Sequence, residues 1–294
     1  MIYSYLEGRL GNILFEIAAG ASLAKKMNVP FKALTCYPDI LPDNNTIPEY
    51  VKAYQKSILR KIDFLDENPK NPKVSEEPSF DYQPLPFEKD ILLKGFFQSE
   101  KYFDEEYVRD LFGMDAETAF YIQQKYGHLL KLNPVSVQLR RGDYLNIQYK
   151  HPVCQMSYYR KAMSAFAPDT FFIILSDDID WCKKHFKGKQ FFFVEEESPL
   201  IDLYLQSLCK HNIISNSSFG WWGAWLNTNP QKRVIYPTPW FSPRIKLNTK
   251  DLCPETWEKK PIARLAELYF WTYYSLIKCK LKNRIYLLSR LWRI

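Results

Sequence analysis

From Pro134 onward the chain alternates short β-rich runs with helical stretches, and this alternation constrains the fold more than any other feature. The β-rich runs read VSVQL, FFIILS, QFFFV and NIIS, and the stretches between them include SYYRKAMSAF, WCKKHF and LIDLYLQSLCK. Strands that alternate with helices form βαβ units, which build a parallel sheet. Because ligands of such sheets gather at the carboxyl ends of the strands, the residues that follow each run are the candidates for a site.

The first 25 residues predict a strand, a tight turn and a helix. An apolar run from Ile2 to Leu6 is followed by Gly8 and Gly11, and Asn12 is a plausible N-cap for the helix. A glycine turn that leads into a helix N-terminus favours an anion. An ordinary strand-to-helix turn explains the segment equally well.

Two further segments complete the N-terminal part. Residues 36–94 are rich in proline and charge and only weakly periodic, which is typical of a surface excursion rather than a core. The segment LLKGFFQSEKYF returns to a strand-like texture, and residues 104–126 predict helix. With 46% hydrophobic and 16% aromatic residues, the 294-residue chain has ample material for a core in one large or two smaller domains.

The charge distribution excludes an extended nucleic-acid footprint. The net charge is +7, but residues 259–294 hold nine Lys or Arg and one acid, so the rest of the chain sums to −1. The six cysteines form no CxxC pair, which suits a reducing compartment. No signal peptide and no run of about twenty apolar residues is evident. We expect a cytoplasmic protein, either soluble or peripheral on the inner face of the cytoplasmic membrane.

An arginine pair follows the first β-rich run. VSVQL leads directly into Arg140, Arg141, Gly142 and Asp143. Two guanidinium groups that leave a buried strand are unfavourable unless they meet an anion, and the arginine fork fits phosphate oxygens in a bidentate way. We predict a phosphate contact here. The alternative is a solvated loop that pairs with local acids such as Asp143.

Polar side chains also follow two later runs. Asp177 and Asp178 come after FFIIL, where carboxylates can accept hydrogen bonds from a nucleobase or a ribose, although N-capping of the next helix explains Asp178 equally well. Asn216, Ser217 and Ser218 come after NIIS and offer donors to phosphate oxygens. The three tryptophans that follow predict a core plug under the site for at least two of them.

Several blocks together, in order and spacing, resemble glycosyltransferase family 11, the α-1,2-fucosyltransferases. They are EGRLGNILFEIA, GFFQSEKYF, VSVQLRRGDYL, LSDDIDWCK, SLCKHNIISNSSFGWWGAWL, VIYPTPWF and DLCPETW, which cover roughly residues 1 to 258. The resemblance implies a GT-B-like fold of two α/β halves. The expected parts are an acceptor-side half over 1–132, a half that binds GDP-fucose over 133–258, and a basic aromatic tail over 259–294.

The resemblance also implies the reaction and its residues. L-fucose would pass from GDP-β-L-fucose to a galactoside hydroxyl, usually O2, with inversion and without a metal or cofactor. The acceptor would be a galactose-containing oligosaccharide or lipid-linked glycan. Arg140 would neutralise the diphosphate, and Asp143 is the candidate general base unless the leaving phosphate takes the proton. The implied donor-binding residues are Gly11, Asn12, Arg140, Arg141, Asp177, Asp178, Asn216, Ser217 and Ser218.

Four residues depart from the family pattern and leave alternatives open. The family usually has His where this chain has Gln138, GGLGNQ where it has Arg9 and Ile13, and Ser where it has Gly220. One alternative is therefore a GDP-sugar-binding protein that has lost turnover. Another is a metal-dependent glycosyltransferase that uses the DxD triplet of Asp178 and Asp180.

The C-terminal tail has a different texture. An aromatic cluster, YFWTYY, precedes apolar residues that recur at helical spacing on one stripe, while most basic residues fall outside this stripe. The stripe residues are Ile277, Leu281, Ile285, Leu288 and Trp292. Basic amphipathic helices with tryptophan often lie in a membrane interface, so residues 262–294 predict peripheral membrane contact. A helix docked on the body or on a second subunit is the alternative.

Overall fold

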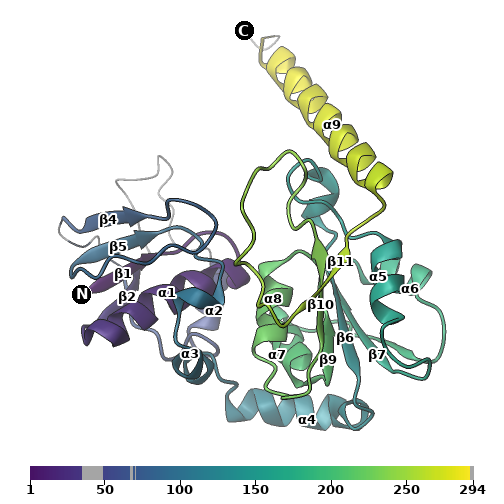
Figure 1. Cartoon of the computed structure of the whole chain (residues 1–294), viewed down its shortest axis with the longest axis horizontal. Helices are drawn as coiled ribbons and strands as arrows, with labels where there is room; N and C mark the ends of the chain where they lie inside the picture. Colours follow the sequence, from purple (N-terminus) through teal and green to yellow (C-terminus); the bar gives the residue numbers. More distant parts are fainter. Residues whose placement is uncertain (35–48, 67–68, 70, 292–294) are drawn as a thin grey trace. The chain divides into compact units, whose positions relative to one another are not determined.

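The computed structural model describes residues 1–34, 49–66, 69 and 71–291. The chain divides into two compact units: the first is Met1–Lys125 with Leu247–Glu255, and the second is Tyr126–Lys246 with Thr256–Ile294. Each unit has a parallel sheet and an apolar core of its own (Figure 1). The predicted α/β class, with a parallel sheet in the C-terminal half, is confirmed.

The first unit is built on a five-stranded sheet in the order β3-β2-β1-β5-β4, in which every pair is parallel. The strands are β1 (Ile2–Tyr5), β2 (Phe31–Leu34), β3 (Phe64–Leu65), β4 (Lys73–Glu76) and β5 (Ile91–Lys94). After β3 the chain moves to the opposite edge and returns to place β5 beside β1. This sheet therefore has a switch point between β1 and β5.

Helix α1 (Leu10–Met27) covers one face of this sheet, where Ala19 and Leu23 pack with Ile2 and Leu93 in the core. The later helices are η1 (Glu100–Tyr102), α3 (Glu105–Leu111) and α4 (Ala116–Leu130), and α2 (Glu49–Tyr54) precedes them. The predicted helix over 104–126 is thus two helices with a break between them. Helix α4 leads from the first unit into the second.

The turn before α1 differs from the prediction in its cap. Arg9 is the N-cap, and the Asn12 amide already donates to the Arg9 carbonyl oxygen at 2.9 Å. The assignment of Asn12 as N-cap is therefore wrong, because the helix begins at Leu10. Gly8 has a φ of +84°, and a Cβ there would lie 2.6 Å from Nδ2 of Asn12, so this glycine is the one that the turn requires.

The interpretation of residues 36–94 as a surface excursion is wrong for its last part. Strand β5 lies inside the sheet, between β1 and β4, and Ile91 and Leu93 are fully buried in the core. The strand is only four residues long and follows a proline-rich, charged stretch, so its apolar signal is diluted in any longer window. Residues 36–48, 67, 68 and 70 lie outside the described part of the chain.

A short return segment, Leu247–Glu255, completes the first unit. Its Asp251 carboxylate pairs with Lys101 Nζ at 2.5 Å and accepts a hydrogen bond from the Tyr82 amide at 3.1 Å. Lys250 pairs with Asp81 at 3.1 Å. The chain therefore crosses between the two units three times.

The second unit contains a six-stranded parallel sheet in the order β11-β10-β9-β6-β7-β8. The strands are β6 (Val135–Leu139), β7 (Phe172–Ser176), β8 (Phe191–Phe193), β9 (His211–Ile213), β10 (Val234–Thr238) and β11 (Glu258–Pro261). Numbered within the unit, this is the 3-2-1-4-5-6 order of doubly wound nucleotide-binding sheets. Its switch point lies between β6 and β9.

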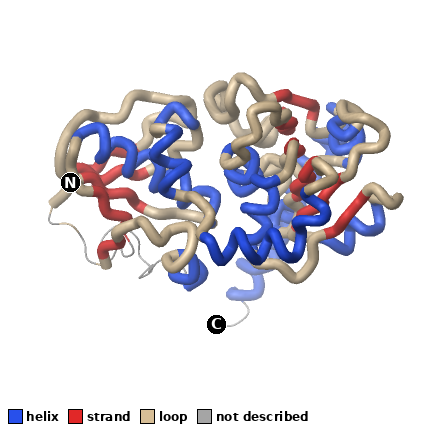
Figure 2. The backbone as a smooth tube through the Cα atoms, turned by 90° about the horizontal axis from the view of Figure 1, so that it is seen from below, coloured by secondary structure: helices blue, strands red, loops and turns tan. Residues whose placement is uncertain are grey.

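Helices cover both faces of the second sheet (Figures 1 and 2). Helices α5 (Met156–Met163) and α6 (Ile179–His185) lie on one face, and α7 (Pro199–Leu208) and α8 (Ser218–Trp225) lie on the other. Trp221, Trp222 and Trp225 of α8 are all buried and pack against one another. The predicted core plug is therefore confirmed for all three tryptophans.

The tail forms one helix, α9 (Leu265–Leu291). Within the described residues, no helix is long and apolar enough to cross a membrane. Leu268, Thr272 and Ser275 form the buried side of α9 within the second unit. Ile277 and Leu281, which the sequence places on the apolar stripe, are exposed.

Candidate active site

The candidate site lies at the carboxyl edge of the second sheet. Three neighbouring strands, β9, β6 and β7, end there, and their following loops carry Asn216–Ser218, Arg140–Tyr144 and Asp177–Asp178. The loops after β6 and β9 touch, because the Tyr144 hydroxyl donates to the Asn216 carbonyl oxygen at 3.2 Å. The polar residues that the sequence predicted after separate runs therefore gather at the switch point of one sheet.

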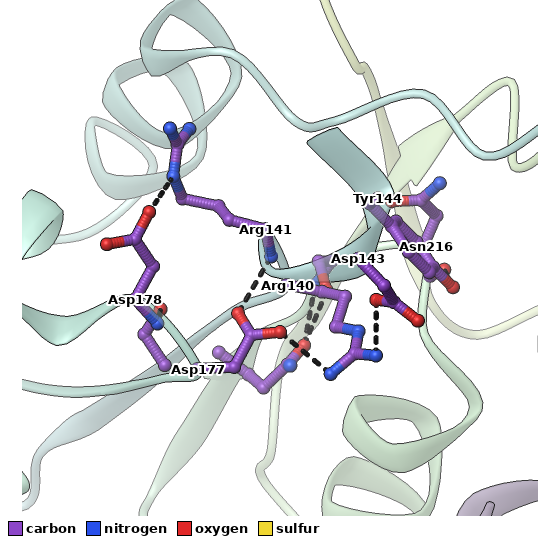
Figure 3. A network of polar contacts seen from close by, with 10 residues as sticks. Arg140, Arg141, Asp143, Tyr144, Asp177, Asp178 and Asn216 are labelled. Atoms are coloured by element: carbon purple, nitrogen blue, oxygen red, sulfur yellow. Dashed lines mark hydrogen bonds and ion pairs between the residues drawn. The ribbon is translucent and has the colours of Figure 1, made fainter. Parts of the chain in front are cut away.

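Arg140 is held between two carboxylates (Figure 3). Its Nη2 lies 2.5 Å from Oδ1 of Asp143, and its Nη1 lies 2.7 Å from Oδ2 of Asp177. The guanidinium also lies over the Tyr144 ring, 5.3 Å from the centroid, and its side chain is only 15% exposed. A guanidinium has five N–H donors in a planar fork, so these two ion pairs orient Arg140 and leave donors for a ligand anion.

Asp177 fixes the turn that follows β6. Its Oδ1 accepts a hydrogen bond from the Arg141 amide at 2.8 Å while its Oδ2 pairs with Arg140. A Cβ at Gly142 would lie 2.6 Å from Oδ2 of Asp177, so a side chain there would collide with the carboxylate. Asp177 thus touches the protein's own turn, and contact with a ligand stays a prediction.

Arg141 points away from Arg140 (Figure 3). Its Nε donates to Oδ2 of Asp178 at 3.0 Å, and its guanidinium stacks on Trp181 at 3.6 Å from the ring centroid. His185 also stacks on Trp181, with the two ring centroids 3.9 Å apart. Stacking and a carboxylate partner at this distance favour a positioning role for Arg141.

Asp178 is the N-cap of α6, since its Oδ1 accepts a hydrogen bond from the Trp181 amide. The capping explanation of the sequence analysis therefore applies to Asp178, and Asp180 lies in the first turn of the helix. Among the described residues, no group of three or more His, Cys, Asp or Glu side chains is arranged to hold a metal ion. Binding of guanine by Asp178 stays a prediction.

The loop after β9 supplies a helix N-terminus. Ser217 is the N-cap of α8 and Ser218 is its first residue, so the N-terminus of this helix and the amides of its first turn lie at the carboxyl edge of the sheet. The side chain of Asn216 is fully buried, and its Nδ2 donates to the carbonyl oxygens of Pro152 and Trp240, each at 2.9 Å. These bonds give Asn216 a structural role in the loop.

Two aromatic residues of the site were not predicted. Tyr144 stacks on His151 with ring centroids 4.9 Å apart, next to Arg140. Burial raises the pKa of Tyr144 and lowers the pKa of His151, so both rings stay neutral at neutral pH. Tyr144 follows RRGD directly and could have been found there, whereas the sequence around His151 carries no signal.

Two departures from the family pattern fit each other in space. Oε1 of Gln138 accepts hydrogen bonds from the Ser215 hydroxyl at 2.6 Å and the Ser215 amide at 3.2 Å, which joins the ends of β6 and β9. A Cβ at Gly220 would lie 2.5 Å from the same oxygen. Gly220 therefore leaves the space that the Gln138 side chain occupies.

The predicted residues of the N-terminal turn lie in the first unit. Gly11 is buried in the first turn of α1, and Asn12 Oδ1 accepts a hydrogen bond from Gln98 Nε2 at 2.9 Å. Arg9 is exposed, and Ile13 is buried in the core. Donor contacts by Gly11 and Asn12 stay predictions.

Residues 4–259 match the model of glycosyl transferase family 11, so the chain belongs to this family. The alpha-1,2-colitosyltransferase of Escherichia coli is 38% identical over 183 residues, which cover 55% of this chain and 60% of the relative. Galactoside alpha-(1,2)-fucosyltransferase 1 of Saimiri boliviensis boliviensis is 35% identical over 105 residues, which cover 31% of this chain and 28% of the relative. The chain thus spans less than two thirds of the length of these relatives.

Among solved structures, fucosyltransferase NodZ from Bradyrhizobium is 16% identical to this chain with a TM-score of 0.47, over 76% of this chain and 91% of NodZ. The resemblance stated from the sequence blocks is confirmed by the family match over residues 4–259.

Replacement of Gly220 by Ser should destabilise the protein by about 1–3 kcal/mol, because the new side chain overlaps Oε1 of Gln138. In a Gln138→Ala background the same replacement should lower the free energy of unfolding by markedly less. The double-mutant cycle should therefore give a coupling free energy of about 0.5–3 kcal/mol. Urea unfolding of the wild type, both single variants and the double variant measures this coupling. Equal penalties in the two backgrounds would show that the residues are independent.

Proposed function

We propose that the protein is a galactoside 2-α-L-fucosyltransferase that transfers L-fucose from GDP-β-L-fucose to a galactoside hydroxyl with inversion. The observation that carries this proposal is Arg140, a guanidinium held by two carboxylates at the switch point of a doubly wound sheet, in a member of family 11. The serines at the N-terminus of α8 add backbone amides at the same edge. Arginine forks and helix N-termini are the groups that bind a diphosphate.

The proposed chemistry depends on the leaving group. Cleavage of the bond between fucose C1 and the phosphate oxygen builds positive charge on the sugar ring and negative charge on GDP. Arg140 is oriented before the reaction by Asp143 and Asp177, so it can stabilise the developing charge without reorganising. The acceptor hydroxyl would lose its proton to Asp143 or to the leaving phosphate. No metal or cofactor is part of this proposal.

The donor sugar is the point on which the relatives differ. One relative is named for colitose, a deoxy relative of L-fucose, and others are named for fucose. Both names specify an α-1,2 linkage, so the proposed linkage is the same for either donor. The assay must therefore present both GDP-sugars.

Release of GDP from GDP-fucose in the presence of EDTA and lactose tests this function, with GDP-colitose in parallel and reactions without acceptor as controls. We expect release that lactose or another β-galactoside stimulates and EDTA leaves unchanged. Product analysis by NMR should then give an α-1,2 linkage. Loss of activity in EDTA would instead favour the metal-dependent alternative with Asp178 and Asp180. GDP binding without transfer or hydrolysis would favour the protein with lost turnover.

Replacement of Arg140 by Lys should lower kcat by about 10²–10³-fold, because one preorganised charged donor to the leaving diphosphate is lost. A lysine presents one ammonium group and cannot bridge Asp143, Asp177 and a phosphate together. Arg160→Lys is the matched control, since Arg160 is exposed on α5. Near wild-type kcat for Arg140→Lys would disprove the assignment of this arginine.

We also propose that α9 contacts the inner face of a cytoplasmic membrane that contains anionic lipids. Large apolar residues gather on its exposed surface: Leu265, Tyr269, Phe270, Trp271, Tyr273, Tyr274, Ile277 and Leu281. Lys278 and Lys280 are exposed beside them. The charge of the tail, +8 over residues 259–294, complements anionic lipid headgroups, to which each Lys or Arg adds about 1 kcal/mol near the surface.

The membrane contact is testable without disturbing the buried side of α9. In a variant with Ser in place of Phe270, Tyr273, Tyr274 and Ile277, the exposed apolar side chains proposed to enter the membrane are removed. Its binding to phosphatidylglycerol vesicles, measured by sedimentation, should therefore be mostly lost. Its turnover with lactose should stay unchanged. Phe120→Ser, which removes an exposed aromatic ring from α4, should bind like the wild type. Equal sedimentation of the wild type and the fourfold variant would exclude the proposed contact.

A further inference from the structure

Three aromatic rings continue from Arg140 into the second unit, each in contact with the next. The Arg140 guanidinium lies over the Tyr144 ring, 5.3 Å from its centroid. His151 stacks on Tyr144 with the ring centroids 4.9 Å apart and the planes inclined by 23°. Phe241 packs against His151 with centroids 5.5 Å apart. His151 is thus linked to the arginine through Tyr144.

The backbone next to His151 is held by the loop that follows β10. The carbonyl oxygens of Tyr149 and Lys150 accept hydrogen bonds from Ser242, from its hydroxyl at 2.6 Å and from its amide at 2.9 Å. Ser242 directly follows Phe241, so the same loop contacts both the backbone of this segment and the His151 ring. The position of the His151 ring is therefore fixed by two parts of the second unit.

Tyr144 needs such a neighbour to present a fixed face to Arg140. Its hydroxyl donates to the Asn216 carbonyl oxygen at 3.2 Å. The hydroxyl lies on the axis about which the ring turns, so this hydrogen bond leaves the ring free to rotate. The attraction between a guanidinium and a ring depends on the face of the ring. The stacked His151 ring therefore sets the face that Tyr144 presents.

Packing alone does not explain a histidine at this position. Nδ1 of His151 is buried and has no hydrogen-bond partner among the described residues. A buried polar atom without a partner is unfavourable, and phenylalanine would provide a flat ring without such an atom. Histidine differs from phenylalanine in carrying a proton that exchanges near neutral pH.

The surroundings of the His151 ring oppose its protonation. Burial lowers the pKa of His151, and the charges of Lys150 and Arg140 lower it further, whereas Asp143 acts in the opposite direction. Phe241, which packs against the ring from the loop after β10, carries no charge. The folded protein therefore favours the neutral ring. As the pH falls through the lowered pKa, protonation places a second buried cation one ring away from Arg140.

We propose that His151 is a positioning residue for Arg140: the neutral ring holds the face of Tyr144 against the guanidinium, and protonation of the ring at low pH releases both. The inference rests on the proposed function, because Arg140 acts on the departing GDP of that reaction. It adds a residue that works through Tyr144 and sets the lower pH limit of transfer.

Two replacements of His151 separate the effect of the ring from that of its proton. His151→Phe keeps a flat ring and should transfer fucose at neutral pH with a kcat close to that of the wild type. His151→Ala removes the ring and should lower kcat by about 10–100-fold, because misplacement of a catalytic group by about 1 Å can cost about 10²-fold.

The pH profile is the readout that a purely structural role would not change. In the wild type, kcat/KM for GDP-fucose should fall as the pH drops below 6.5, the ordinary pKa of histidine. His151→Phe should keep its plateau over this range, down to the pH at which carboxylates take up protons. His128→Phe, at an exposed site on α4, is the control and should keep the wild-type profile.

NMR follows the arginine without any turnover. The chain has four histidines, and His151→Phe identifies the signal of His151. The guanidinium N–H signals of Arg140, identified by their loss in Arg140→Lys, should broaden in the wild type over the pH range in which His151 takes up its proton. In His151→Phe these signals should persist over the same range.

The outcomes separate this inference from the proposed function. Arg140 signals that follow the His151 titration in the wild type but not in His151→Phe, without any transfer from GDP-fucose, would support the positioning role and count against the transferase. Transfer with the same fall in kcat/KM at low pH in both proteins would overturn the positioning role and leave the transferase intact. A His151 pKa at or above 6.5 would also overturn it. Equal melting temperatures at neutral pH show that the variants fold.

Discussion

The candidate site depends on one carboxylate, that of Asp177. Asp177 directly follows β7. Its carboxylate binds two groups that follow the neighbouring strand β6, the Arg140 guanidinium at 2.7 Å and the Arg141 amide at 2.8 Å. Charge-assisted hydrogen bonds of this kind fix geometry as well as adding free energy. Because Gly142 has no Cβ, the turn can close against the carboxylate. The direction of Arg140 is therefore set by the sheet rather than by a flexible loop.

Much of the second unit could be predicted from the sequence, because its strands are continuous apolar runs separated by helical stretches. The runs at β6 and β7 match the structure closely. The N-terminal half was harder to predict. Strand β5 is four residues long within a charged, proline-rich region, and Asn12 resembles a cap although the helix begins at Leu10. Short buried strands and glycine turns depend on tertiary contacts that a local pattern does not contain.

The site shows the same division between local and distant information. The ion pair between Arg140 and Asp143 joins residues that are three apart in the chain, and the sequence pattern already offers it as an alternative to a phosphate contact. The contact with Asp177 and the fit between Gln138 and Gly220 join residues far apart in the chain, so no local pattern contains them. Single departures from a family pattern therefore have limited meaning until their neighbours are known. Here Gln138 joins the ends of β6 and β9 through Ser215, and Gly220 leaves the space for its side chain.

The return segment Leu247–Glu255 has a consequence for how such a gene can evolve. Asp251 holds Lys101 and the Tyr82 amide of the first unit, although it is encoded after most of the second unit. A single recombination event that joined the N-terminal half of one family member to the C-terminal half of another would separate these partners. New combinations of the two units therefore require two coordinated exchanges, or matched changes on both sides of the Lys101–Asp251 pair.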